Sequence, residues 1–144
     1  MIDISYKKTL NYSPKNIYEI VSDVDFYSQF IPGCLSSEII SREGNVIEAI
    51  LELKYLVMSG KFKSRVTLDP KKLTIISEGI EGPFSSIFTK WSFDEVDEGV
   101  LVNINIVLDL NNKIFESILK KNIKKLSLKL LLALKKGLIF YISL

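Results

Sequence analysis

Residues 21–34 read VSDVDFYSQFIPGC, an apolar segment that ends in a turn. Four of its apolar side chains fall within seven positions: Val24, Phe26, Tyr27 and Phe30. The Ile-Pro-Gly-Cys that follows cannot continue a helix, because proline lacks the amide hydrogen that a helix interior needs. Three interpretations fit this segment: a hydrophobic element that fixes short helices to a core, a lid over a cavity, or a surface for a partner.

The residues before and within this segment predict a strand and two helices. Residues 2–10 alternate apolar and polar side chains, as a half-buried strand does. Ser13 is a suitable N-cap, and Pro14 occupies the first helical position, where proline is favoured. We therefore expect a helix over 14–22 and a second short helix over about 23–30, with Asp23 as its cap rather than as an acid–base partner of Asp25.

After the turn, the period of the apolar pattern changes to two. The alternation predicts six strands, separated by turn residues, at 35–42, 46–55, 60–68, 73–78, 85–95 and 101–110. Asn111 and Asn112 then precede a long helix that runs from about Lys113 into the 130s. Its predicted apolar stripe, which Asn122 interrupts, consists of Phe115, Ile118, Leu119, Leu126, Leu130 and Ala133.

This order predicts an α+β fold in which a curved seven-stranded antiparallel sheet surrounds a long C-terminal helix, with two short helices after the first strand. A chain of 144 residues is expected to form a single domain over 1–144 and to bury about two-thirds of its unfolded surface. Only one long helix is available to cover the inner face of the sheet. We therefore expect an apolar cavity between them, although periodicity leaves open whether side chains fill it.

The composition excludes several kinds of chemistry. The chain has no histidine, so it lacks the usual general base and the commonest transition-metal ligand. Its one cysteine, Cys34, excludes an internal disulfide and a thiolate metal cluster, and we interpret it as a packing residue rather than a reactive thiol. We expect no metal, no cofactor and no enzymatic activity. The sequence shows no signal peptide and no apolar run of the roughly 20 residues needed to span a membrane, so a soluble, cytoplasmic protein is expected.

Charge is distributed unevenly along the chain. Residues 1–110 carry 11 Lys/Arg and 16 Asp/Glu, a net charge of −5, whereas residues 111–144 carry 8 Lys and 1 Glu, a net charge of +7. Lysines of the long helix can bind an anionic membrane surface or RNA, because clustered cations are attracted to phosphates; the alternative is a solvated lysine face. The membrane is the better specific interpretation, since no aromatic residue for base stacking is interleaved with Lys120, Lys121, Lys124 and Lys125.

Two motifs resemble a known family. Residues 18–34 contain Y-x-x-V-x-D-V-x-x-Y-x-x-F-I-P-x-C, and residues 81–93 contain E-G-P-F-x-x-I-x-x-x-W-x-F. Both are similar to signatures of the coenzyme Q-binding, START-like family (polyketide cyclase/lipid transport), which includes bacterial ribosome association toxins. The resemblance covers residues 2 to 136 approximately and implies the helix-grip fold. One departure is Gly33, where the family usually has tryptophan.

The resemblance implies two functions. The first is non-enzymatic binding of an isoprenoid quinone such as ubiquinone, or of another lipid, by a carrier or chaperone that supports respiration. The second is a ribosome-associated, toxin-like protein that binds the large ribosomal subunit and blocks subunit association. A small hydrolase or cyclase on the same scaffold is disfavoured by the missing histidine. The expected location is the cytoplasm, with transient contact at the inner face of the membrane, and the sequence does not indicate an oligomeric state.

The predicted ligand site joins residues from the lid, the sheet and the long helix. The inward side chains are either cavity wall or solid core, and Asn122 lies either in the cavity or at the edge of the stripe in solvent. Phe30 and Ile31 are predicted to line the lid, and Pro32, also a predicted ligand-binding residue, forms its hinge with Gly33. The remaining predicted ligand-binding residues are Leu53, Tyr55, Phe62, Phe84, Trp91 and Ile106 in the sheet, and Ile118, Leu119 and Asn122 in the helix.

Overall fold

The computed structural model describes the backbone of residues 1–55, 58–82 and 84–143, and the side chains of residues 1–54, 59–82 and 86–138. Seven strands and three α-helices follow one another in the predicted order. The elements are β1 (Ile2–Leu10), α1 (Pro14–Ser22), the 3-10 turn η1 (Val24–Phe26), α2 (Tyr27–Phe30), β2 (Cys34–Glu43), β3 (Val46–Tyr55), β4 (Met58–Asp69), β5 (Thr74–Glu81), β6 (Phe84–Val96), β7 (Gly99–Leu110) and α3 (Lys113–Ser143).

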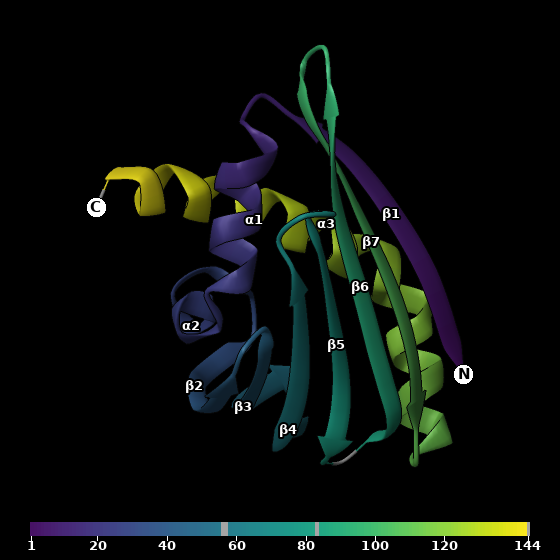
Figure 1. Cartoon of the computed structure of the whole chain (residues 1–144). Helices are drawn as coiled ribbons and strands as arrows, with labels where there is room; N and C mark the ends of the chain where they lie inside the picture. The colour runs from purple at the N-terminus through teal and green to yellow at the C-terminus, as the bar shows by residue number, and fades with distance from the viewer. Residues whose placement is uncertain (56–57, 83, 144) are drawn as a thin grey trace.

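All seven strands form one antiparallel sheet in the order β1-β7-β6-β5-β4-β3-β2. The first two strands of the chain therefore lie at opposite edges, and α1, η1 and α2 connect them. Figure 1 shows α3 running behind the sheet, from the end of β7 toward the short helices. No helix among the described residues is both long enough and apolar enough to span a bilayer.

The beginning of α1 follows the predicted chemistry. Ser13 has an extended backbone, and its hydroxyl accepts a hydrogen bond from the Asn16 amide at 3.2 Å, while Pro14 begins the helix. The helix buries Ile17, Ile20 and Val21 against the sheet, because they recur at helical spacing. The prediction that the Asp23 side chain caps the second helix was wrong: Asp23 precedes η1 but makes no capping bond.

Asp25 instead fixes the short helices to the edge strand β2. Its carboxylate accepts a hydrogen bond from the Ile39 amide at 2.8 Å, and its carbonyl accepts one from the Ser37 hydroxyl at 3.3 Å. Ser37 in turn accepts a hydrogen bond from the Ser28 amide at 3.2 Å. Asp25 therefore has a structural role in holding η1 and α2 beside β2.

The core divides into two clusters along the inner face of the sheet. The larger cluster joins α1 and the α1-facing half of the sheet to Leu131, Leu134 and Leu138 of α3. The smaller one surrounds Ile2, Leu108 and Leu110, with partly buried side chains of α3 packed against it. The sheet thus holds both halves of α3 against a single concave face.

The predicted stripe of α3 was wrong at its centre. Ile118 is 40% exposed, and Asn122 is exposed, with its side-chain amide donating to the Ile118 carbonyl at 2.9 Å. The buried face instead contains Glu116 and Ser127, whose hydroxyl donates to the Ile123 carbonyl at 2.9 Å. Glu116 and Ser127, both hydrogen-bonded, lie on the inner face, whereas the pattern predicted their apolar neighbours Phe115 and Leu126 there. The predicted stripe was therefore about one residue out of register. Of the alternatives for Asn122, the solvent-exposed one is correct.

Glu116 is buried because three donors surround its carboxylate. The Leu110 amide donates to it at 2.8 Å, the amino group of Met1 lies 2.5 Å away, and the Lys113 ammonium lies 3.4 Å away. These bonds, with the Leu110 amide as the largest cause and the amino group next, lower the pKa of Glu116 to about 2. The carboxylate thereby joins the start of β1, the end of β7 and the first turn of α3.

Candidate functional site

The inner face of the sheet is closed at one end and accessible in the middle. Along β7, Val102 and Ile104 are fully covered, the next inward residue, Ile106, is only half-buried, and Leu108 is covered again. Ile106 has β1 on one side and β6 on the other, so its exposure does not come from a sheet edge. The side chains of α3 therefore cover Ile106 incompletely.

The neighbours of Ile106 across the sheet are half-buried as well. In the strand register, Ile106 faces Ile4 on β1 and Thr89 on β6, and Thr89 faces Ser77 on β5. All four side chains point to the concave side and are partly exposed. We call Ile4, Ile106, Thr89 and Ser77 the inner row. It crosses β1, β7, β6 and β5, so incomplete burial of the inner face extends over four neighbouring strands.

A pair of hydroxyl groups lies at one end of the inner row. The oxygens of Ser64 and Ser77 are 2.6 Å apart, and Ser64 is only 1% exposed. A bond between two hydroxyls uses one of their two hydrogens as a donor, and neither hydroxyl makes another hydrogen bond within the described part of the chain. The pair therefore keeps one donor hydrogen that is not used within the described residues, on a wall that is otherwise largely apolar.

The other end of the row is aliphatic and is covered by α3. Leu119 and Ile123 of α3 pack in the same cluster as Ile4, Ile87 and Ile106. The space beneath the sheet thus has hydroxyls toward β4, β5 and β6, and aliphatic side chains toward β7, β1 and α3. This gradient matches a molecule with a hydrogen-bond acceptor at one end and a hydrocarbon at the other.

The structure brings most of the predicted site residues into the two clusters. Phe62 and Trp91 are buried, while Leu53, Ile106, Phe30 and Ile31 are half-buried against the larger cluster, and Leu119 lies against the smaller one. Pro32 is exposed, as are Ile118 and Asn122 on the outer side of α3. The predictions for Tyr55 and Phe84 concern side chains that lie outside the described residues. The ligand-binding role of every residue in this set stays a prediction.

Sequence reasoning missed the polar members of the site. Ser64 lies on the inward face of β4 between Phe62 and Val66, and it was not selected as a site residue. Ser77 and Thr89 are small and were not selected either. The available signal was a hydroxyl residue on the apolar side of an alternating strand, because such a group needs a partner when it is buried.

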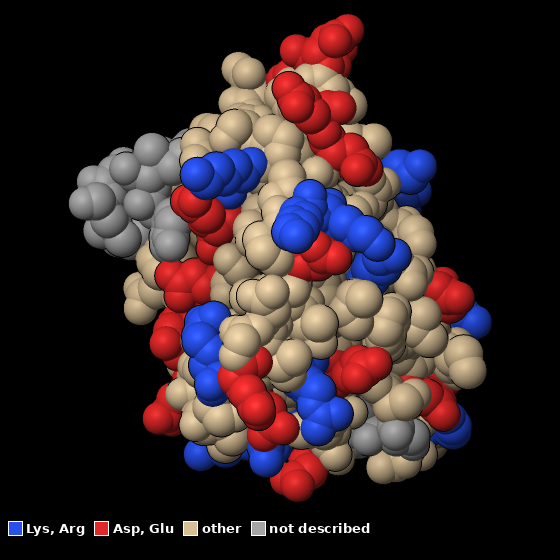
Figure 2. Space-filling view, viewed as in Figure 1, with Lys and Arg blue, Asp and Glu red and all other residues tan. Residues whose placement is uncertain are grey.

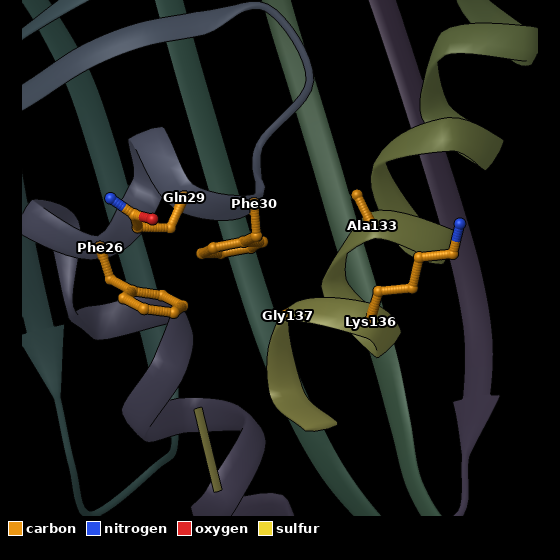
Figure 3. A pocket seen from close by; sticks show the side chains of 6 residues that line it. All are labelled: Phe26, Gln29, Phe30, Ala133, Lys136 and Gly137. Carbon is orange, nitrogen blue, oxygen red and sulfur yellow. The ribbon is translucent and has the colours of Figure 1, made fainter. Parts of the chain in front are cut away.

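Phe30 forms the contact between the short helices and α3. Its ring centroid lies 5.6 Å from that of Phe26 and 5.8 Å from that of Tyr27. A hollow of about 230 Å³ lies beside it, lined by Phe26, Gln29, Phe30, Ala133, Lys136 and Gly137. Figure 3 shows the two phenylalanine rings on one side of the hollow, and Ala133, Lys136 and Gly137 of α3 on the other. This position suits a lid residue and a packing residue equally.

The turn after α2 is held to β3 and is not a free hinge. Gly33 has a φ of +79°, and a Cβ there would lie 2.6 Å from the Lys54 carbonyl oxygen. The Lys54 amide also donates to the Gly33 carbonyl at 2.8 Å. The positive φ and the close carbonyl oxygen favour glycine at this position.

Two further polar side chains of the segment are structural. The Tyr27 hydroxyl donates to the Val21 carbonyl, and burial raises its pKa. Cys34 is buried, its thiol donates to the Ser36 carbonyl at 3.4 Å, and burial raises its pKa above the ordinary value. The interpretation of Cys34 as a packing residue is confirmed by its burial in the larger cluster, and a raised thiol pKa also disfavours the reactive thiolate.

Comparison with known proteins agrees with this geometry. A family model described as polyketide cyclase / dehydrase and lipid transport matches residues 10–135, and the chain belongs to this family. Ribosome association toxin RatA of Rickettsia prowazekii (strain Madrid E) is 27% identical over 139 residues, which cover 94% of this chain and 95% of that protein. The mitochondrial coenzyme Q-binding protein coq10 of Schizosaccharomyces pombe is 25% identical over 112 residues, which cover 74% of this chain and 68% of that protein.

Solved structures share the fold over its whole length. The 18 kDa protein CC1736 from Caulobacter crescentus superposes with a TM-score of 0.83 at 22% identity, covering 100% of both chains. A START superfamily protein from Mycobacterium smegmatis gives a TM-score of 0.77 at 20% identity, covering 98% of this chain and 97% of that one. The predicted fold class, a START-like sheet around a long C-terminal helix, is confirmed.

Proposed function

We propose that this protein binds an isoprenoid quinone in the space beneath the inner row and carries it without changing it chemically. The observation that carries the proposal is the inner row itself: four inward side chains on neighbouring strands that the rest of the fold leaves only partly buried. A quinone has carbonyl oxygens at one end and a hydrocarbon tail at the other. Its carbonyl would accept the spare hydrogen of the Ser64–Ser77 pair, and its tail would lie along Ile106, Ile4 and Leu119.

Two further points support a quinone carrier over an enzyme. A relative with 25% identity is named as a coenzyme Q-binding protein. The chain has no histidine, and neither the hydroxyl pair nor the row has a general base among its members. The proposed location is the cytoplasm, with contact at the inner face of the membrane from which the lipid is taken.

Quenching of Trp91 fluorescence tests the proposal. Trp91 is the only tryptophan, and it follows Thr89 on the same face of β6, about 7 Å along the strand. We expect a short-tailed ubiquinone to quench lipid-free protein saturably. Ser77→Ala and Thr89→Val should weaken binding, whereas Thr67→Val, on the outer face of β4, should not. Quenching that does not saturate, or that is equal in all variants, would contradict binding at the inner row.

Ribosome binding is the second candidate. It is favoured by the similarity to ribosome association toxin RatA of Rickettsia prowazekii, which covers 94% of this chain and 95% of that protein. The exposed lysines on α3 would provide the surface for ribosomal RNA. Sedimentation of purified ribosomal subunits with the protein tests it: co-migration with the large subunit and fewer joined ribosomes would support the toxin-like function. The two candidates separate cleanly, because Ser77→Ala alters quinone binding and leaves the outer surface of α3 unchanged.

A further inference from the structure

The outer side of α3 carries an apolar ridge that nothing in the fold covers. Four aliphatic side chains on this helix are exposed: Ile114 by 78%, Ile118 by 40%, Leu128 by 49% and Leu132 by 57%. Lys121 and Lys125 continue the same line between them, because the positions 114, 118, 121, 125, 128 and 132 are spaced alternately by four and three residues. We call these six residues the outer ridge. It lies opposite the face that buries Leu131, Leu134 and Leu138.

The charge around the outer ridge has one sign. Seven exposed lysines follow it along α3: Lys120, Lys121, Lys124, Lys125, Lys129, Lys135 and Lys136. Within the described residues none of them has an ion-pair partner, and the one acidic residue of the helix, Glu116, is buried among its own donors. The outer face of the sheet differs, because Lys63 and Arg65 pair with Glu48 at 3.4 Å and 3.6 Å. Figure 2, viewed from the sheet side, shows both signs interspersed there.

We propose that the outer ridge docks on an anionic lipid bilayer, with α3 lying in the plane of the interface. The aliphatic side chains would enter the boundary between headgroups and acyl chains, and the lysines would extend to the lipid phosphates. Lysine near an anionic bilayer is favoured by about a factor of five per residue. The combination of leucines with unpaired lysines is the composition that such an interfacial helix needs.

Two other occupants fit the ridge less well. A nucleic acid would use the lysines, but it has no use for Leu128 and Leu132, and no described aromatic side chain lies on this face for stacking on bases. A second copy of the chain could pair with the ridge helix to helix, because its spacing of four and three residues suits such pairing. This pairing would place Lys121 and Lys125 beside the same lysines of the other copy, with no carboxylate to offset their repulsion. A bilayer satisfies both the aliphatic and the cationic residues.

With this docking surface, the two faces of α3 have different roles. Its inner face, through Leu119 and Ile123, covers the inner row, and its outer face would lie on the membrane. A lipid ligand would then leave the bilayer beside the helix that covers its binding space. Docking does not depend on the identity of the ligand, so the vesicle experiment below can succeed even if the quinone assay fails.

Vesicle sedimentation tests the proposal with two pairs of substitutions. We expect the protein to bind vesicles of phosphatidylcholine with 30% phosphatidylglycerol, to bind pure phosphatidylcholine far more weakly, and to be released by salt. Leu128→Gln with Leu132→Gln, and separately Lys124→Gln with Lys125→Gln, should each lower the partition coefficient at least tenfold. Matched controls, Leu35→Gln with Ile40→Gln on β2 and Lys61→Gln with Lys90→Gln on the sheet, should change it less than twofold.

Three outcomes would overturn the proposal. The first is equal binding to both kinds of vesicle, or no binding at all. The second is a leucine pair that binds like the wild type while the lysine pair loses affinity for vesicles and ribosomal subunits alike, which would mark a surface for nucleic acid. The third is lipid-free dimerisation in analytical ultracentrifugation that the leucine substitutions abolish. All substituted residues are exposed, so an unchanged melting temperature is the expected folding control.

Discussion

Gly137 allows α2 to approach α3, and replacing it with alanine should destabilise the protein. In an open helix interior, Gly→Ala is stabilising by about 1 kcal/mol. Here the added Cβ would lie 2.7 Å from the Phe30 Cβ, 2.8 Å from its Cγ and 3.0 Å from its Cδ2. The nearest of these atoms is attached directly to the backbone of α2, so a rotamer change cannot move it away.

The size of the loss in the free energy of unfolding depends on how firmly α2 is held in place. The Ile31 amide donates to the Tyr27 carbonyl at 2.8 Å, and Ser28 is bonded to Ser37 on β2 at 3.2 Å, so α2 cannot retreat without losing bonds. Overpacking of this kind costs about 1–3 kcal/mol, which exceeds or equals the helical gain. We expect Gly137→Ala to lower the free energy of unfolding by up to about 2 kcal/mol, or the melting temperature by a few degrees.

The assay is urea unfolding followed by circular dichroism, with Ser117→Ala as the matched control. Ser117 is exposed on the same helix, so its substitution reports the propensity gain alone and should stabilise slightly. In a Phe30→Ala background the ring contacts are gone, and the cost of Gly137→Ala should shrink. If Gly137→Ala stabilises the wild type by about 1 kcal/mol, the close contact between α2 and α3 is refuted.

Three other predictions follow from groups described above. Glu116 has a pKa of about 2 in the folded protein, below that of an unfolded glutamate. Its contribution to stability is therefore present above about pH 4.3 and is lost as the pH falls toward 2. The melting temperatures of Glu116→Gln and the wild type should differ most at pH 7 and become equal at acidic pH. Cys34 has a raised pKa and is buried, so alkylation by iodoacetamide at pH 7.5 should be much slower in folded than in unfolded protein, and equal rates would place the thiol at the surface. Asn122→Leu should leave quinone affinity unchanged, because the side chain lies in solvent, and an altered dissociation constant would return Asn122 to the ligand space.

The strands were predictable because their two faces meet different environments. Alternation over 60–68 and 101–110 identified the inward side chains correctly, since one face of the sheet is covered by helices and the other by water. The beginning of α1 was predictable from Ser13 and Pro14, because capping depends on neighbouring residues only. These features are local in the sequence, and they define most of the fold.

The orientation of α3 and the polar part of the site were not predictable in this way. Glu116 lies inside because of the Leu110 amide and the amino group of Met1, which are distant groups that no helical pattern reveals. The aliphatic residues of the outer ridge lie on the exposed face of α3, so apolar side chains occur on both faces of the helix. Hydrophobicity alone therefore could not identify the buried face. The partnership of Ser64 with Ser77 depends on the pairing of β4 with β5, and it becomes visible only in three dimensions.

The strand order has a consequence for how the chain folds. Ile2 on β1 pairs with Leu108 on β7, so the first strand to be synthesised waits for the last one before it can join the sheet. Closing a loop of about a hundred residues carries an entropy cost that is recovered only when the remaining strands are already in place. We therefore expect the hairpins from β2 to β7 to form before β1, with its inward Ile2, Ile4 and Leu10, joins the sheet.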